Sequence, residues 1–174
     1  FTGARGVTGG GVAIESGSAG ITDCLFTDNE SLLGGGLSCI SGSVTVTDCT
    51  FRGNSSEAGG GAFFQKSAAI LAGCLFEQNA AITNGGKGQG QGGGIAASLG
   101  TLTITESVLR DNDAVSGGGI HLSGGSASIG DTRFCGNGPD QIFGTWTNQG
   151  NTAVRETCSD LYVPEDFPTI ESAF

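Results

Sequence analysis

The sequence predicts an all-β fold, a parallel β-helix of about six coils with roughly 25 residues in each coil. A segment that opens with phenylalanine or leucine recurs, and in its first five copies it leads to a GGG triplet. The copies start at Phe1, Phe26, Phe51, Phe76, Leu109 and Phe134, at offsets of 25, 25, 25, 33 and 25 residues. Such self-similarity is typical of solenoid proteins. The chain also has 34 glycines and no methionine, and because each glycine costs about 1 kcal/mol inside a helix, helical repeats are excluded.

Each repeat supplies about three short strands, because apolar residues alternate there with other side chains. The strand after GGG has the inward columns Val12, Leu37, Ala62, Ile95, Ile120 and Ile14, Cys39, Phe64, Ala97, Leu122. The second strand has the inward columns Ala19, Val44, Ala69, Leu102, Ala127 and Ile21, Val46, Leu71, Ile104, Ile129. Coils stack at about 4.8 Å, so we expect Phe26, Phe51, Phe76 and Phe134 to form a third buried column. The residues between inward positions, including His121, are expected to face solvent.

Two polar columns accompany the phenylalanines. Asparagine follows each start by three residues from the second copy onward, at Asn29, Asn54, Asn79, Asn112 and Asn137. Because asparagine tolerates turn geometry and its amide can hydrogen-bond along a stack, we interpret this column as a structural ladder. The second column is Cys24, Cys49 and Cys74, continued by Ser107 and Thr132. This replacement indicates a slot for a small, nearly apolar side chain and argues against a metal site.

The chain divides into three parts. Residues 1–137 are predicted to form the regular coils, with an insertion loop at 80–91; residues 138–161 form an atypical terminal coil that caps the core; and residues 162–174 form an extended tail. Cys135 is expected on the outside, and Cys158 lies in the cap, so we predict a disulfide between them. Cys24, Cys39, Cys49 and Cys74 should stay thiols, because stacked neighbours about 4.8 Å apart are farther apart than the Cβ atoms of a disulfide.

Composition restricts the partners. The formal charge is -10, the pI is about 4.2, and the seven Lys and Arg residues form no cluster along the sequence, which argues against nucleic acid and anionic membranes as partners. No apolar run approaches the roughly 18 to 20 residues of a membrane-spanning helix. Six cysteines together with abundant Gly, Ser and Thr favour an extracellular or cell-surface location.

The paired GGG and FxxN motifs resemble those of right-handed parallel β-helix repeat proteins, and in particular the GGAI and FxxN repeats of polymorphic outer-membrane proteins. The resemblance covers Phe1 to about Asn137. It implies a right-handed, single-stranded solenoid in an extracellular or cell-surface setting, with an adhesive or scaffolding role and no defined active site.

The tail is similar to the "VPxDFPTIxxA" segment that ordinarily begins such β-helices and covers their first coil. Here it ends the sequence. We therefore expect Val163, Phe167, Ile170 and Phe174 to dock on the first coil of the next copy, a heterologous contact that would join copies head to tail into a filament. The alternative is that the chain was cut from a longer array whose next β-helix begins in this tail.

The competing function is a polysaccharide lyase or hydrolase, or a polysaccharide-binding module, because such proteins use this fold and fold alone does not decide function. Their chemistry needs grouped carboxylates with calcium or a basic residue. The candidate acids are Asp23, Asp48, Glu106 and Asp131 with Asp28 and Asp111, and the candidate bases are Arg52, Arg110 and Arg133. The acids recur once per coil, where aspartate suits a turn, and a catalytic cluster would break the repeat.

We therefore expect a non-enzymatic structural or adhesive module that needs no cofactor. Its expected partners are further copies, end to end, and a cell-surface glycan or protein. Calcium on the acidic corners is a weaker alternative, because hard cations prefer carboxylate oxygens. Ice binding through Thr45, Thr47, Thr103 and Thr105 is another, although Ala72 and Gly130 interrupt the second threonine rank.

Overall fold

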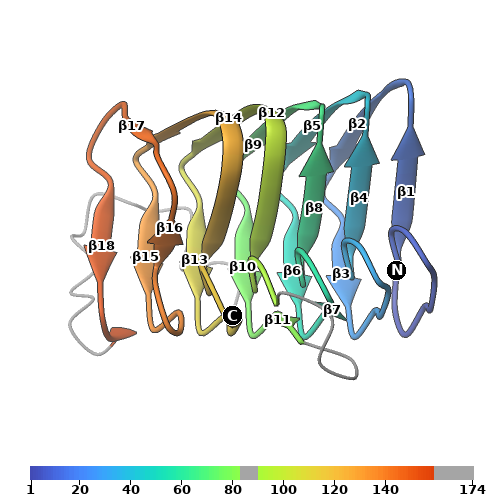
Figure 1. Ribbon diagram of the computed structural model, residues 1–174, viewed down its shortest axis with the longest axis horizontal. Coiled ribbons are helices and arrows are strands. Elements are labelled where there is room, and N and C mark those ends of the chain that lie inside the picture. The colour runs from blue at the N-terminus through green and yellow to red at the C-terminus, as the bar shows by residue number, and fades with distance from the viewer. Residues whose placement is uncertain (83–89, 159–174) are drawn as a thin grey trace.

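The computed structural model of the chain describes residues 1–82 and 90–158. The described chain winds into a right-handed parallel β-solenoid with about 25 residues per turn, which gives an elongated rod (Figure 1). This confirms the predicted fold class. The rod has about five turns rather than six, because the stretch after Phe134 adds only strands of two or three residues. No helix among the described residues is long and apolar enough to cross a membrane.

Eighteen strands make up the described chain. The strands of the first three turns are β1 Val12–Glu15, β2 Ser18–Thr22, β3 Leu25–Thr27, β4 Leu37–Ile40, β5 Ser43–Thr47, β6 Thr50–Arg52, β7 Ser55–Ser56, β8 Ala62–Gln65, β9 Ala68–Ala72, β10 Leu75–Glu77 and β11 Ala80–Ala81. Those of the later turns are β12 Ile95–Thr105, β13 Val108–Arg110, β14 Ile120–Gly130, β15 Arg133–Cys135, β16 Ile142–Phe143, β17 Thr147–Asn148 and β18 Ala153–Arg155.

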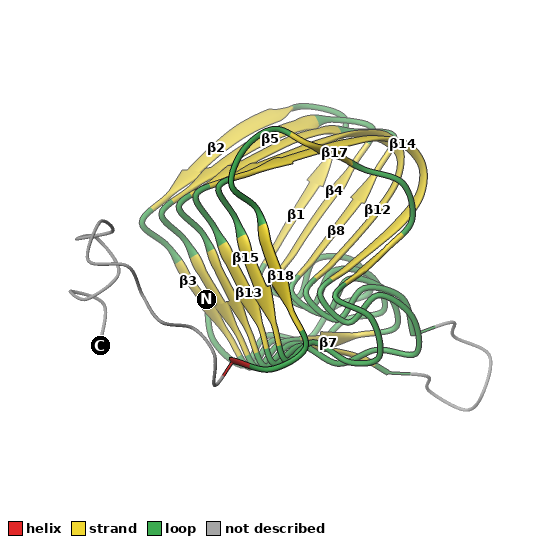
Figure 2. Ribbon diagram, turned by 90° about the vertical axis from the view of Figure 1, so that its left-hand side faces the viewer, coloured by secondary structure: helices red, strands yellow, loops and turns green. Residues whose placement is uncertain are grey.

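All strand pairs are parallel, and each strand pairs with its equivalent one turn away. One sheet has the order β18-β15-β13-β10-β6-β3, and a larger sheet contains two faces of the rod because β12 and β14 continue around a corner (Figure 2). The register matches the predicted columns: Phe26 pairs with Phe51, and Phe51 pairs with Phe76. The 33-residue offset between Phe76 and Leu109 leaves this register intact, so the extra residues of the insertion do not disturb the stack.

The core is a continuous column of like side chains. The rings of Phe1, Phe26, Phe51 and Phe76 are stacked, with centroids 4.5 to 4.9 Å apart. Leu109 and Phe134 continue this column and are also buried. Val44, Val46, Leu71, Ile104 and Ile129 fill the neighbouring columns. The equivalent residues therefore lie above one another, as the repeat predicts.

The strand after each glycine triplet departs from the expected pattern. Its outward column, Ser38, Phe63, Ala96 and His121, is buried, with exposed fractions of 1%, 7%, 4% and 6%. The prediction that His121 is a surface residue is therefore wrong. The Ser116 side chain hydrogen-bonds the His121 ring at 3.1 Å, and the Phe143 ring stacks on it with centroids 4.8 Å apart. Ser116, which lies before the triplet, and Phe143, in the terminal coil, thus cover His121 from outside.

The triplets allow the turns to stack closely. Gly59 has φ of +67°, and a Cβ atom there would clash with the Ala62 carbonyl. A Cβ atom on Gly60 would clash with the carbonyl oxygen of Gly93 in the next turn. Only glycine meets both requirements, since it accepts positive φ and allows close backbone approach.

Candidate functional site

The asparagine column is a hydrogen-bonded ladder. Asn29, Asn54, Asn79, Asn112 and Asn137 are all buried. In each of the four steps, the backbone N–H and the Nδ2 of one asparagine donate to the Oδ1 of the next at 2.8 to 3.0 Å. Each Nδ2 also donates to a backbone carbonyl of the preceding turn. The asparagine side-chain amides thus use their hydrogen-bonding groups on one another and on the backbone, which is a structural role.

At each end of the asparagine ladder, a different residue takes the place of asparagine. At its start the backbone N–H of Ala4 donates to Asn29 Oδ1 at 3.0 Å. At its far end Gln141 takes the place of a further asparagine, because its Oε1 accepts from Asn137 Nδ2 at 2.6 Å. Gln141 is buried. Its role was missed in the sequence because it lies four residues after Asn137 instead of in the next repeat.

The cysteine column is defined by hydrogen bonding rather than by small size alone. Each S–H or O–H in the column donates to the carbonyl two residues earlier, at 2.8 to 3.3 Å, from Cys24, Cys49, Cys74, Ser107 and Thr132. The Cys24 N–H donates to Cys49 Sγ at 3.4 Å, and the Cys74 N–H donates to Ser107 Oγ at 3.0 Å. The nearly apolar interpretation is therefore incomplete. The shared signal was that Cys, Ser and Thr each carry an S–H or O–H group.

These thiols are free, as is that of Cys39. Burial raises the pKa of Cys39, of Cys49 and of Cys74, the last to about 12. A thiol with so high a pKa carries almost no thiolate near neutral pH and is a poor nucleophile. Within residues 1–82 and 90–158, no group of three or more His, Cys, Asp or Glu side chains is placed to hold a metal ion.

The candidate carboxylates occupy turns, one turn of the rod after another. All six have positive φ between 47° and 55°: Asp23, Asp28, Asp48, Glu106, Asp111 and Asp131. Gly73, with φ of 63°, takes the same place in the third turn. Left-handed backbone at one residue favours Asp, Asn and Gly. The acids therefore form two lines along the rod edges, and the structure does not bring them together into one cluster.

Two of the candidate bases are engaged by one carboxylate. Arg52 and Arg110 both approach Glu77 Oε2, at 3.2 and 3.0 Å, and Glu77 is nearly buried at 8% exposure. The three residues come from β6, β10 and β13, which are adjacent strands. The third candidate, Arg133, lies on the next strand, β15. The sequence analysis did not identify Glu77 as the partner of these arginines. The repeat places it between Arg52 and Arg110 in one column, and this position could have indicated the ion pairs.

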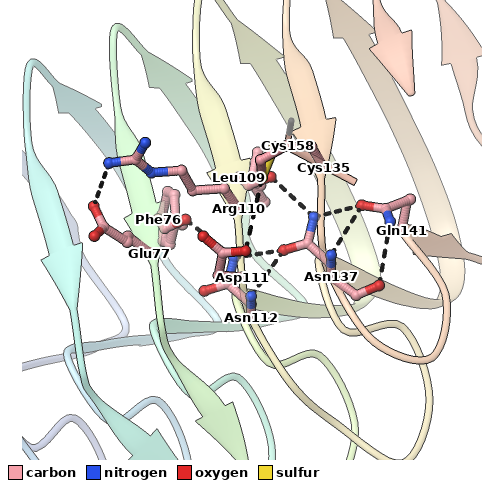
Figure 3. The surroundings of a disulfide bond; sticks show 10 residues. All are labelled: Phe76, Glu77, Leu109, Arg110, Asp111, Asn112, Cys135, Asn137, Gln141 and Cys158. Atoms are coloured by element: carbon pink, nitrogen blue, oxygen red, sulfur yellow. Dashed lines mark hydrogen bonds and ion pairs between the residues drawn. A yellow bond between two sulfur atoms is a disulfide. The ribbon is translucent and has the colours of Figure 1, made fainter. Parts of the chain in front are cut away.

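The sulfurs of Cys135 and Cys158 are bonded, with a Cα–Cα distance of 5.0 Å (Figure 3). Cys135 follows the inward Phe134 on β15 and takes the outward position that was expected, but it is completely buried instead of exposed. The Cys158 sulfur lies 3.7 Å from Asp111 Oδ1. The disulfide thus fastens the end of the terminal coil to the outer side of the six-stranded sheet, beside Arg110 and Asp111 (Figure 3).

A groove of about 440 Å³ lies on another side of the rod. One wall is the outer side of β8, β12 and β14, and the other consists of residues that precede the glycine triplets. Its lining is Leu33, Ala58, Phe63, Gln65, Gln91, Ala96, Ala97, Ser98, Leu99, His121 and Ser123. Among these, His121 is the only titratable side chain, and burial lowers its pKa. None of the candidate acids or arginines lines this groove.

Val163, Phe167, Ile170 and Phe174, predicted to dock on the next copy, lie outside the described residues, as do residues 83–89 of the insertion loop. The rest of that loop includes β11, which pairs with β7.

A family model described as the right-handed beta helix region matches residues 4–158. Comparisons with curated proteins and with solved structures gave no significant match.

Proposed function

The chain belongs to the right-handed β-helix family, and we propose that it is a non-enzymatic structural or adhesive module. The observation that carries this proposal is the regularity of its candidate carboxylates, which recur at equivalent turn positions and, among the described residues, form no group of three or more that could hold a metal ion. Six candidate acids occupy left-handed turn positions spread along the rod, and a glycosidase or a calcium-dependent lyase needs carboxylates grouped around one point. The asparagine and cysteine columns support the same function. Their side chains hydrogen-bond to the next residue of the same column and to the backbone, which is a structural use.

The proposed location is extracellular or at the cell surface. The Cys135–Cys158 disulfide supports it, since disulfides persist in oxidising compartments. Within this location, the GGG and FxxN repeats favour a relationship to the GGAI and FxxN repeats of polymorphic outer-membrane proteins. A cell-surface glycan or protein is the partner class that follows from an adhesive role.

We further propose that copies associate end to end. Among the described strands, β1, β2 and β3 each lie at the edge of a sheet, and such edges carry N–H and C=O groups able to pair with another chain. At the other end, β18 is the edge strand of the six-stranded sheet, and its Val154 is 47% exposed. The two ends differ, so the contact is heterologous and can continue as a filament.

A polysaccharide-binding or polysaccharide-cleaving module is the second candidate, and the groove beside β8, β12 and β14 is the feature that favours it. Its described lining has hydroxyl and amide groups at Gln65, Ser98 and Ser123 in successive turns. It presents no carboxylate from those residues. This composition fits binding of a neutral chain better than cleavage.

Electron microscopy of the purified full chain, together with a depolymerisation assay on acidic and neutral polysaccharides, tests the two functions. The structural proposal predicts uniform fibres that lengthen with protein concentration and no release of sugar fragments. Short monodisperse rods that release fragments would overturn it in favour of the enzyme. Ser98→Trp, which fills the groove, should leave fibres unchanged, whereas it would abolish any glycan binding.

A further inference from the structure

The outer side of the six-stranded sheet, formed by β3, β6, β10, β13, β15 and β18, differs from the rest of this acidic protein. Its strands alternate, so the residues beside the buried phenylalanine column point outward. One outward column begins with Leu25, which is 53% exposed, and continues through partly exposed Leu75 and Val108. The column beside it is charged. We call this surface the arginine face.

Four of the seven Lys and Arg residues lie on the strands of the arginine face: Arg52, Arg110, Arg133 and Arg155. Glu77 is the only acidic residue on the same strands. Its single carboxylate is shared by Arg52 and Arg110, so the group of three keeps a net positive charge. Turn carboxylates such as Asp28 and Asp111 border the face, and their Oδ1 atoms lie beside Gly53 and Gly136. The strands themselves therefore combine apolar and positive groups.

The disulfide fixes where the remaining chain leaves the described structure. Cys158 is bonded to Cys135 on β15, on the arginine face itself. Six strands about 4.8 Å apart span about 24 Å, whereas residues 159–174, fully extended, reach about 50 Å. The C-terminal segment therefore starts on the face and is long enough to cross it.

The sequence of that segment complements the surface. Residues 159–174 contain Asp160, Glu165, Asp166 and Glu171 and no Lys, Arg or His. They also contain the apolar residues Leu161, Tyr162, Val163, Phe167, Ile170 and Phe174. We propose that the C-terminal segment 159–174 packs on the arginine face of its own chain. Its acidic groups pair with the arginines, and its apolar side chains cover Leu25, Leu75 and Val108. This arrangement does not depend on whether copies associate end to end.

A photoreactive phenylalanine analogue at position 167 of the full chain tests the location. Isotope-labelled and unlabelled chains are mixed before irradiation, and the cross-linked peptides are identified by mass spectrometry. The expected products join position 167 to β3, β6, β10 or β13 within one chain. Mixed-isotope products would overturn the proposal and assign the segment to a neighbouring copy. Products on other faces, or none, would also overturn it.

A charge-swap experiment tests the chemistry through chymotrypsin cleavage after Tyr162, which precedes Val163. Arg52→Glu with Arg155→Glu should speed cleavage about tenfold, because each surface ion pair contributes modestly and two are lost. Adding Glu165→Arg and Asp166→Arg to that variant should restore slow cleavage, which a merely unfolded variant could not do. Arg5→Glu is the matched control, since Arg5 pairs with Glu30 away from this face, and it should change nothing. Equal cleavage rates in all variants, or no restoration, would refute the pairing.

Discussion

Replacing Asn54 by alanine should remove more stability than any surface substitution, because the ladder leaves no spare partners. Asn54 Oδ1 accepts from both the backbone N–H and the Nδ2 of Asn29, at 3.0 and 2.9 Å. Its Nδ2 donates to the Phe26 carbonyl and to Asn79 Oδ1. Asn54 is 0% exposed, so water cannot replace these bonds. A buried donor without an acceptor costs about 1 to 3 kcal/mol.

Asn54→Ala removes Asn54 Oδ1, the acceptor for the backbone N–H and the Nδ2 of Asn29, and also leaves a small cavity. We therefore expect the free energy of unfolding to fall by about 4 kcal/mol, a large share of the roughly 5 to 15 kcal/mol of a typical domain. Urea unfolding followed by circular dichroism measures the loss. Hydrogen exchange at Asn29 and Ser55 shows whether the damage is local, which matters because repeat proteins can open in parts. Thr45→Ala, exposed on β5, is the control. A difference below about 1 kcal/mol between the two variants would refute the ladder as a stabilising element.

Three further outcomes are expected. Cys158→Ser should free the terminal coil while the earlier turns stay intact, at a cost of about 3 kcal/mol for the 23-residue separation; hydrogen exchange that stays slow after Cys135 would contradict this. The pKa of His121 is lowered from 6.5 by burial, so above 6.5 the ring is neutral whether folded or unfolded, and below it the unfolded chain takes up the proton first. Stability should fall as the pH drops from 6.5 through the folded-state pKa, and His121→Gln should remove that dependence of the urea midpoint. Iodoacetamide at pH 8 should label partly exposed Cys24 well before Cys74, whose pKa is about 12; equal labelling in the folded protein would show that the stack opens.

The sequence predicted the inside of the rod because parallel stacking places each residue above its equivalent. Any side chain that fits one turn then fits the next, so Phe26, Phe51 and Phe76 reveal their column by repetition alone. The disulfide was predicted on other grounds, because Cys135 takes an outward position beside Phe134 and Cys158 lies in the terminal coil, so neither belongs to the inward cysteine column. What occurs once cannot be found by repetition, and Gln141, which ends the ladder, was missed for that reason.

The outside of the rod was harder to predict because an outward side chain can meet solvent or a covering loop. His121 points away from the core, yet the residues before the triplet and the terminal coil enclose it. Alternation along a strand predicts only whether a side chain points toward the core or away from it. Whether an outward side chain is then covered depends on the path of the turns. The S–H and O–H contacts of the Cys24 column were missed for another reason: Cys, Ser and Thr share small size as well as an S–H or O–H group, and only the size was used.

The outward columns therefore carry the information that distinguishes this rod from a plain repeat. In the column through Thr27, Arg52, Glu77, Arg110 and Cys135, every residue differs from the one before it. A stack of identical charges at about 4.8 Å would repel itself, whereas Glu77 between two arginines avoids this and leaves the net charge positive. A solenoid can change such a column without disturbing its core, because each outward residue touches only its neighbours. A binding surface on this chain is thus expected where the repetition stops on the outside, and the arginine face is one such place.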